Sequence, residues 1–176
     1  MCAYLGLGRI LYLLPQDEFV NNLLQTVLYT LQTAQNPMLL QASVKCIYYS
    51  VKYSKVHTQY LLQNKLMAIL QQFIDKAIDE KLCLYSLLVM KELAVNGFAM
   101  QFMDNLLFNQ LMRIILQGNE NPMFEVAIDI IKAVAETSSY NVINLASYGL
   151  IRSLCYGLEQ FRVYKDSAIE LIFQIQ

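Results

Sequence analysis

The sequence predicts an all-α fold, and three observations lead to this prediction. Only six glycines and three prolines interrupt 176 residues. Apolar residues recur at spacings of three and four, as on a helix face, and do not alternate as they would in a strand. Two predicted helix starts have the same sequence, Asn-Pro-Met, at Asn36-Pro37-Met38 and at Asn121-Pro122-Met123. In each, a capping asparagine precedes a proline at the first helical position.

Capping residues and helix breakers divide the chain into helices of about 10 to 17 residues. Breaks are expected near the following residues: Pro15, Ser54, Asp79, Gly97, Gly118, Ser138, Gly149 and Arg162. A long helix is expected at about 16–33. Shorter apolar helices are expected at 65–74, 107–116 and 150–158, each preceded by a short segment.

Five of the predicted helices share one pattern, a small residue followed by apolar or small residues three, four, seven and eight positions later. The leading residues are Ala3, Ala42, Ser86, Ala127 and Ala168, which lie 39, 44, 41 and 41 residues apart. The pattern is complete in the helices led by Ser86 and Ala127 and looser in the other three. Positions so spaced form one helix stripe, and the small leading residue lets a neighbouring helix approach closely.

A short helix, a second helix and a longer third helix that carries this stripe resemble the armadillo repeat. The likeness covers about 37–176 and is best in NPMFEVAIDIIKAVAE followed by YNVINLASYGLIRSLCYGL. It implies a right-handed α-solenoid of about four armadillo- or HEAT-like units in one domain, 1–176. The units fall at about 1–36, 37–79, 80–120 and 121–161, with a partial one at 162–176, and the first is degenerate or closer to HEAT repeats.

In armadillo proteins the third helices line a concave groove that binds extended peptide segments. Positions two and six after the small residue face this groove, so the resemblance implies the groove residues Val44, Tyr48, Leu88, Glu92, Asp129, Ala133 and Glu170. The nuclear import adaptors of the family use tryptophan there, and this sequence has none. The acidic residues Glu92, Asp129 and Glu170 instead predict a partner segment that carries Lys or Arg beside apolar anchors.

The sequence offers little to catalysis or metal binding. The only histidine, His57, has no local partner motif. The bare Gly6-Leu7-Gly8 lacks the third glycine and the preceding strand of a phosphate loop and indicates packing glycines. The cysteines have neither zinc-ligand nor redox spacing: Cys2, Cys46, Cys83 and Cys155. We therefore expect no enzyme activity, no cofactor and no metal.

Charge and hydropathy argue against nucleic-acid-binding, membrane-spanning and secreted proteins. With 13 basic and 14 acidic side chains the net charge is −1, which gives no field to attract nucleic acid. The longest apolar run, 82–90, is far below the roughly 18 residues of a membrane span. Arg9 interrupts the apolar start and no basic leader precedes it, which is the wrong order for a signal peptide. Scattered cysteines favour a reducing compartment, the cytoplasm, with the nucleus left open.

These observations predict a non-catalytic scaffold or adaptor that presents a groove of third helices to a protein segment. The alternative left open is an all-helical enzyme or a lipid- or small-molecule-binding domain, for which an enclosed apolar pocket near His57 would be the sign. The helix at the end of the sequence is apolar all round, where a terminal solenoid unit needs a polar outer face. We therefore expect an excerpt of a longer solenoid, or ends that a partner covers.

Overall fold

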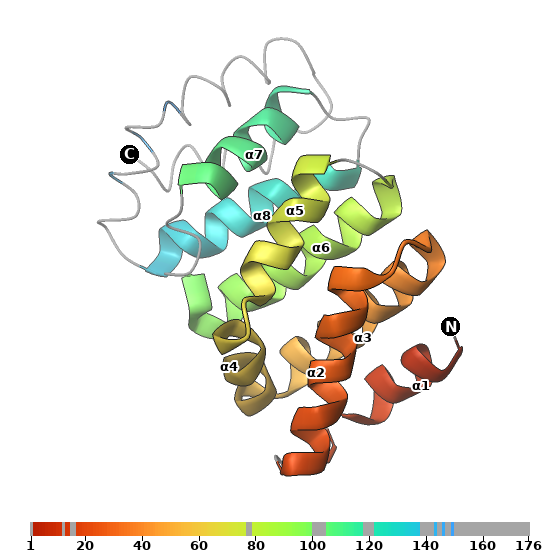
Figure 1. Ribbon diagram of the computed structural model, residues 1–176. Coiled ribbons are helices and arrows are strands. Elements are labelled where there is room, and N and C mark those ends of the chain that lie inside the picture. The colour runs from red at the N-terminus through yellow and green to blue at the C-terminus, as the bar shows by residue number, and fades with distance from the viewer. Residues whose placement is uncertain are drawn as a thin grey trace. The chain divides into compact units, whose positions relative to one another are not determined.

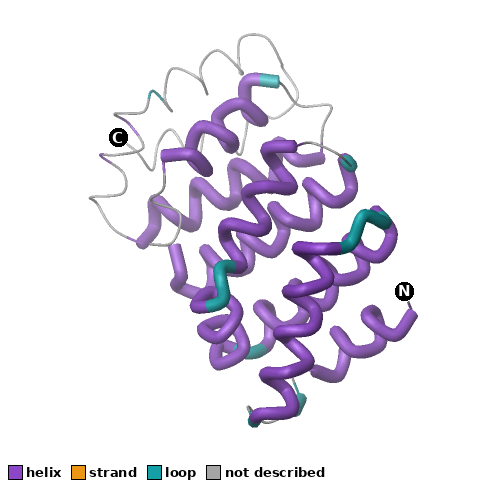
Figure 2. The backbone as a smooth tube through the Cα atoms, in the orientation of Figure 1, coloured by secondary structure: helices purple, strands orange, loops and turns teal. Residues whose placement is uncertain are grey.

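The computed structural model describes residues 2–11, 13–14, 17–76, 79–99, 105–117 and 122–137, together with 143, 146 and 149. All regular elements among these residues are helices, which confirms the all-α prediction (Figure 2). The chain divides into two compact units, Met1–Asn96 and Gly97–Gln176.

The described part of the first unit contains six α-helices. They are α1 (Cys2–Leu11), α2 (Glu18–Thr33), α3 (Pro37–Tyr53), α4 (Lys55–Gln63), α5 (Leu66–Lys76) and α6 (Glu80–Leu93). α6 continues into a π-turn, η1 (Ala94–Phe98), where Gly97 has a φ of +89°. A residue with a side chain is strained in this conformation, so Gly97 ends the helix as predicted.

Polar side chains start these helices at the predicted places. The Asn36 side chain accepts hydrogen bonds from the first amides of α3, whose first residue is Pro37. Ser54 ends α3 and caps α4, and Asp79 caps α6. α2 begins slightly later than predicted, because the carboxylate of Asp17 accepts from an amide of its first turn and fixes the start at Glu18.

Within this unit α3 lies between α1 and α6 and packs against both (Figure 1). α2 packs on α3, α5 packs on α6, and α4 connects the two pairs. The core residues include fully buried side chains from five helices: Leu24, Ile47, Leu61, Leu70 and Met90. Three helices carry the repeated stripe: α1, α3 and α6. They lie side by side in space in the order in which they occur along the chain, with α3 in the middle.

α1 and α3 come into backbone contact at Gly8. A Cβ atom at Gly8 would lie 2.7 Å from the Cα of Cys46 and 3.3 Å from the Tyr49 ring, so no larger residue fits without a shift. A Cβ at Gly6 would meet nothing within 4 Å, so the expectation of a packing glycine is right for Gly8 and wrong for Gly6. The stripe predicted for α1 is also wrong at Ile10, which is 54% exposed.

In the second unit the described helices are α7 (Asn105–Leu116) and α8 (Pro122–Thr137), which pack against each other. α7 begins two residues before the predicted start. The stripe predicted for α8 is buried throughout, at Ala127, Ile130, Ile131, Val134 and Ala135. The helix predicted at 150–158 and the stripe led by Ala168 lie outside the described residues.

Candidate functional site

The residues predicted to line a groove differ in accessibility. On α3 and α6, Tyr48, Leu88 and Glu92 are half-buried and reach the surface, and Asp129 does the same on α8 of the second unit. Val44 is 0% exposed and Ala133 is 8% exposed. Glu170 lies outside the described residues. The outward placement of Val44 and Ala133 is therefore wrong.

Val44 is buried because it belongs to the core row of α3. Residues at spacings of four, three and four share one side of a helix, and this row is buried throughout: Leu40, Val44, Ile47 and Val51. The accessible row is shifted by one residue and contains Gln41, Lys45, Tyr48 and Lys52. Lys45 could have indicated this shift from the sequence, because it is a charged residue at a stripe position where the predicted pattern requires an apolar one.

Ala133 is buried for the same reason in α8. It shares a side of the helix with Val126 and Ile130, which are also buried. The accessible row of α8 contains Glu125, Asp129, Lys132 and Glu136. This row combines three carboxylates with one ammonium group, so the acidic character predicted for this helix is present on its accessible side.

A polar seam follows the boundary between α3 and α6. We define it by Gln41, Lys45, Tyr48 and Lys52 of α3 with Asp79, Tyr85 and Glu92 at the start of α6 and along it. At one end, the Gln41 Nε2 donates a hydrogen bond to Asp79 Oδ1 at 3.0 Å. Midway, the Lys45 Nζ lies 4.3 Å from the centre of the Tyr85 ring, a cation–π contact.

At its other end the seam joins three side chains. The Tyr48 hydroxyl donates to Glu92 Oε1 at 3.1 Å, and the Lys52 Nζ donates to the Tyr48 oxygen at 3.2 Å. Lys52 also lies 3.8 Å from Glu92 Oε1 and over the rings of Tyr48 and Tyr53, at 5.4 and 5.7 Å. The hydrogen bond to Tyr48 and the charge of Glu92 raise the pKa of Lys52. Glu92 is therefore engaged within the chain, which the sequence did not predict.

The seam combines donors, acceptors and aromatic faces in one accessible strip. Its ion pair is solvent-exposed, and such pairs are weak and readily exchanged. The seam holds no nucleophile beside a base, and its two carboxylates, Asp79 and Glu92, are half-buried. Its chemistry suits recognition of polar and charged groups.

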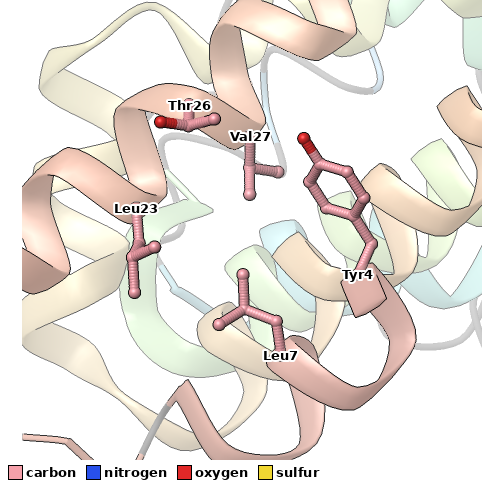
Figure 3. Close-up of a pocket in the computed structure, with 5 residues that line it drawn as sticks. All are labelled: Tyr4, Leu7, Leu23, Thr26 and Val27. Carbon is pink, nitrogen blue, oxygen red and sulfur yellow. The ribbon is translucent and has the colours of Figure 1, made fainter. Parts of the chain in front are cut away.

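An apolar cleft of about 280 Å³ lies between α1 and α2, and its lining residues point into it (Figure 3). The lining consists of Tyr4, Leu7, Leu23, Thr26 and Val27. At its edge the Tyr4 hydroxyl meets Thr30 Oγ1 at 2.8 Å. Tyr4 donates this bond, because the Thr30 hydroxyl itself donates to the Thr26 carbonyl. The cleft is open to solvent, and His57 of α4 is not among its lining residues.

His57 and two cysteines are buried elsewhere in the unit. The His57 Nδ1 has no hydrogen-bond partner, and burial lowers the pKa of this histidine. Burial raises the pKa of the Cys46 thiol to about 12 and raises that of Cys83, so both thiols stay protonated and unreactive. Within the described ranges, no three His, Cys, Asp or Glu side chains are placed to bind a metal ion together.

The described helices are all too short or too polar to cross a membrane. No protein-family model and no curated protein matches the chain, so similarity assigns it to no family.

Proposed function

We propose that the chain is a non-catalytic protein-interaction scaffold, built from armadillo- or HEAT-type repeats, that binds a segment of a partner protein along α3 and α6. The observation that carries the proposal is the bond between Tyr48 and Glu92, which are 44 residues apart. Both residues hold position six of the repeated pattern, and both reach the surface. Under this proposal, equivalent positions of two successive repeats lie next to each other on one accessible strip. A scaffold that binds an extended segment needs such a strip.

The chemistry of the polar seam supports a partner segment with basic and apolar residues. The Glu92 carboxylate is held by Lys52, whose exposed ammonium group a partner's Lys or Arg can replace at little cost. An arginine gains further, because its planar guanidinium binds a carboxylate with two parallel hydrogen bonds and stacks on tyrosine rings. Leu88, half-buried one helical turn before Glu92, provides an apolar contact beside it.

A photo-crosslinking amino acid at Leu88 in the full chain tests this function. A crosslink to one partner in cells is expected at this position and not at Tyr29 of α2, which is more exposed, at 64%. The charge reversal Glu92→Lys is expected to weaken the crosslink, and added salt should weaken it in the unsubstituted chain. Equal crosslinking at Leu88 and Tyr29, or no effect of Glu92→Lys in a chain with unchanged circular dichroism, would contradict the proposal.

The alternative, an enzyme or small-molecule-binding domain with an enclosed apolar pocket, has less support. The cleft between α1 and α2 is open, and its volume of about 280 Å³ lies below the roughly 300 to 1,000 Å³ of usual ligand pockets. Binding of a small apolar molecule with no crosslinked protein partner would favour this alternative.

A further inference from the structure

The outer side of α1 and α2 carries exposed apolar side chains around the cleft. Ile10 follows Leu7 by one turn of α1, and Phe19 precedes Leu23 by one turn of α2, so each lies next to a lining residue on its own helix. Ile10 is 54% exposed and Phe19 is 64% exposed. No lining residue is charged. We call the surface formed by Leu7, Ile10, Phe19 and Leu23 the end face.

The end face repeats a surface that is covered elsewhere in the same unit. On α3, Cys46 and Tyr49 hold positions four and seven of the repeated pattern, and both contact Gly8 of α1. On α1 the same two positions are Leu7, which is half-buried and lines the cleft, and Ile10, which is 54% exposed. The side of α1 that is exposed is thus the side that, on α3, another helix covers.

The backbone of α1 permits the same close approach. Gly6 is exposed, and a Cβ built on it would meet nothing within 4 Å. A helix laid on this side can therefore come near the α1 backbone, as α1 comes near α3 at Gly8. The cleft beside it offers room for an apolar side chain, because its lining is mostly apolar and its two hydroxyls are already bonded. Thr26 donates to the Asn22 carbonyl of its own helix, and Tyr4 is bonded to Thr30 at the edge of the cleft.

We propose that the end face binds one amphipathic helix of a partner protein, which continues the packing of α1 on α3. Large apolar side chains of this helix enter the cleft, and its contacting side carries no charge, because a charge buried against this lining would have no counter-ion. This is the helix-in-groove mode of recognition, with anchors spaced three and four residues apart. It is a second site, separate from the polar seam.

A stapled 14-residue peptide helix, with leucines on one side and lysines on the other, is the probe for binding to the full chain. Ile10→Asp is expected to raise its Kd at least tenfold, whereas Val56→Asp, at a comparably exposed position on α4, should leave the Kd within twofold. Gly6→Gln is expected to weaken binding without loss of folding, because its side chain points into open space. A peptide with glutamates in place of lysines should bind equally well, because the leucine side makes the contact.

Three results would overturn the proposal. One is no binding of the peptide, and another is an equal rise of the Kd in Ile10→Asp and Val56→Asp. The third is sedimentation of the chain as a dimer that Ile10→Asp dissociates, since a second copy would then occupy the end face. Glu92→Lys in the polar seam is expected to leave peptide binding unchanged, so failure of this proposal and failure of the proposed function are told apart.

Discussion

Tyr48 of α3 donates a hydrogen bond to Glu92 of α6, and the two residues hold the same position of a pattern that recurs 44 residues later. A random pairing of two helices would not join equivalent positions. The bond therefore relates the sequence repeat to the helix packing. It forms only when α3 and α6 lie side by side with equivalent positions next to each other. It also explains why Lys52, one turn after Tyr48, lies near the same carboxylate.

Removal of the Tyr48 hydroxyl is expected to weaken this pairing. Tyr48→Phe keeps the ring and should lower the free energy of unfolding by about 1 kcal/mol, because Glu92 and Lys52 each lose a hydrogen-bond partner. Tyr85→Phe is the matched control, since the ring beneath Lys45 carries its cation–π contact. Urea unfolding of both variants checks this, and an equal loss for both would contradict the role given to the Tyr48 bond.

Two glycines of one helix should respond in opposite ways to the same substitution. Gly8→Ala places a Cβ atom 2.7 Å from the Cys46 Cα, and the resulting shift of α1 is expected to cost about 1 to 3 kcal/mol. Gly6→Ala meets nothing within 4 Å and should stabilise the fold by about 0.5 to 1 kcal/mol, because alanine restricts the unfolded chain. The midpoint of thermal unfolding reports both changes. A stable Gly8→Ala variant would show that α1 does not pack on α3 as described.

Most of the helix boundaries in the first unit could be predicted because local chemistry sets them. Asn36, Ser54 and Asp79 each accept a hydrogen bond from an amide of the helix that follows, and such caps depend only on residues nearby in sequence. The same holds for Gly97 in the π-turn that follows α6, because its backbone conformation is strained for any residue with a side chain.

The side of each helix that faces a neighbour was harder to predict. Val44 and Lys45 are adjacent, and the stripe pattern assigned the first to the surface and the second to the contact, whereas the structure has them the other way round. A helix with neighbours on two sides is buried over more than one stripe, so a single stripe does not fix its orientation. Two side-chain pairs depend on that orientation, Lys52 with Glu92 and Gln41 with Asp79. Residues nearby in the sequence do not predict these pairs.

Substitution of one residue in the turn between α4 and α5 is expected to stabilise the fold. Lys65 has a φ of +64°, a left-handed conformation that costs a residue with a side chain about 1 to 2 kcal/mol. Lys65→Gly should raise the free energy of unfolding by about 0.5 to 1 kcal/mol, because glycine adopts this conformation freely but loses more entropy on folding. Lys65→Ala retains the strain and is expected to change little. Equal stability of the two variants in urea would contradict this account.

Acid should destabilise the first unit through His57. Burial lowers the pKa of this histidine below its ordinary 6.5, so between the two values the unfolded chain binds a proton that the folded chain does not. The free energy of unfolding therefore rises with pH across this window, and the stability present above pH 6.5 is lost as the pH falls below it. Carboxylates ordinarily titrate near pH 4, and His57 is the only histidine, so the urea midpoint between pH 7.5 and 5.5 reports mainly this group. His57→Gln should flatten the slope, and an unchanged slope in that variant would assign the acid sensitivity to other side chains.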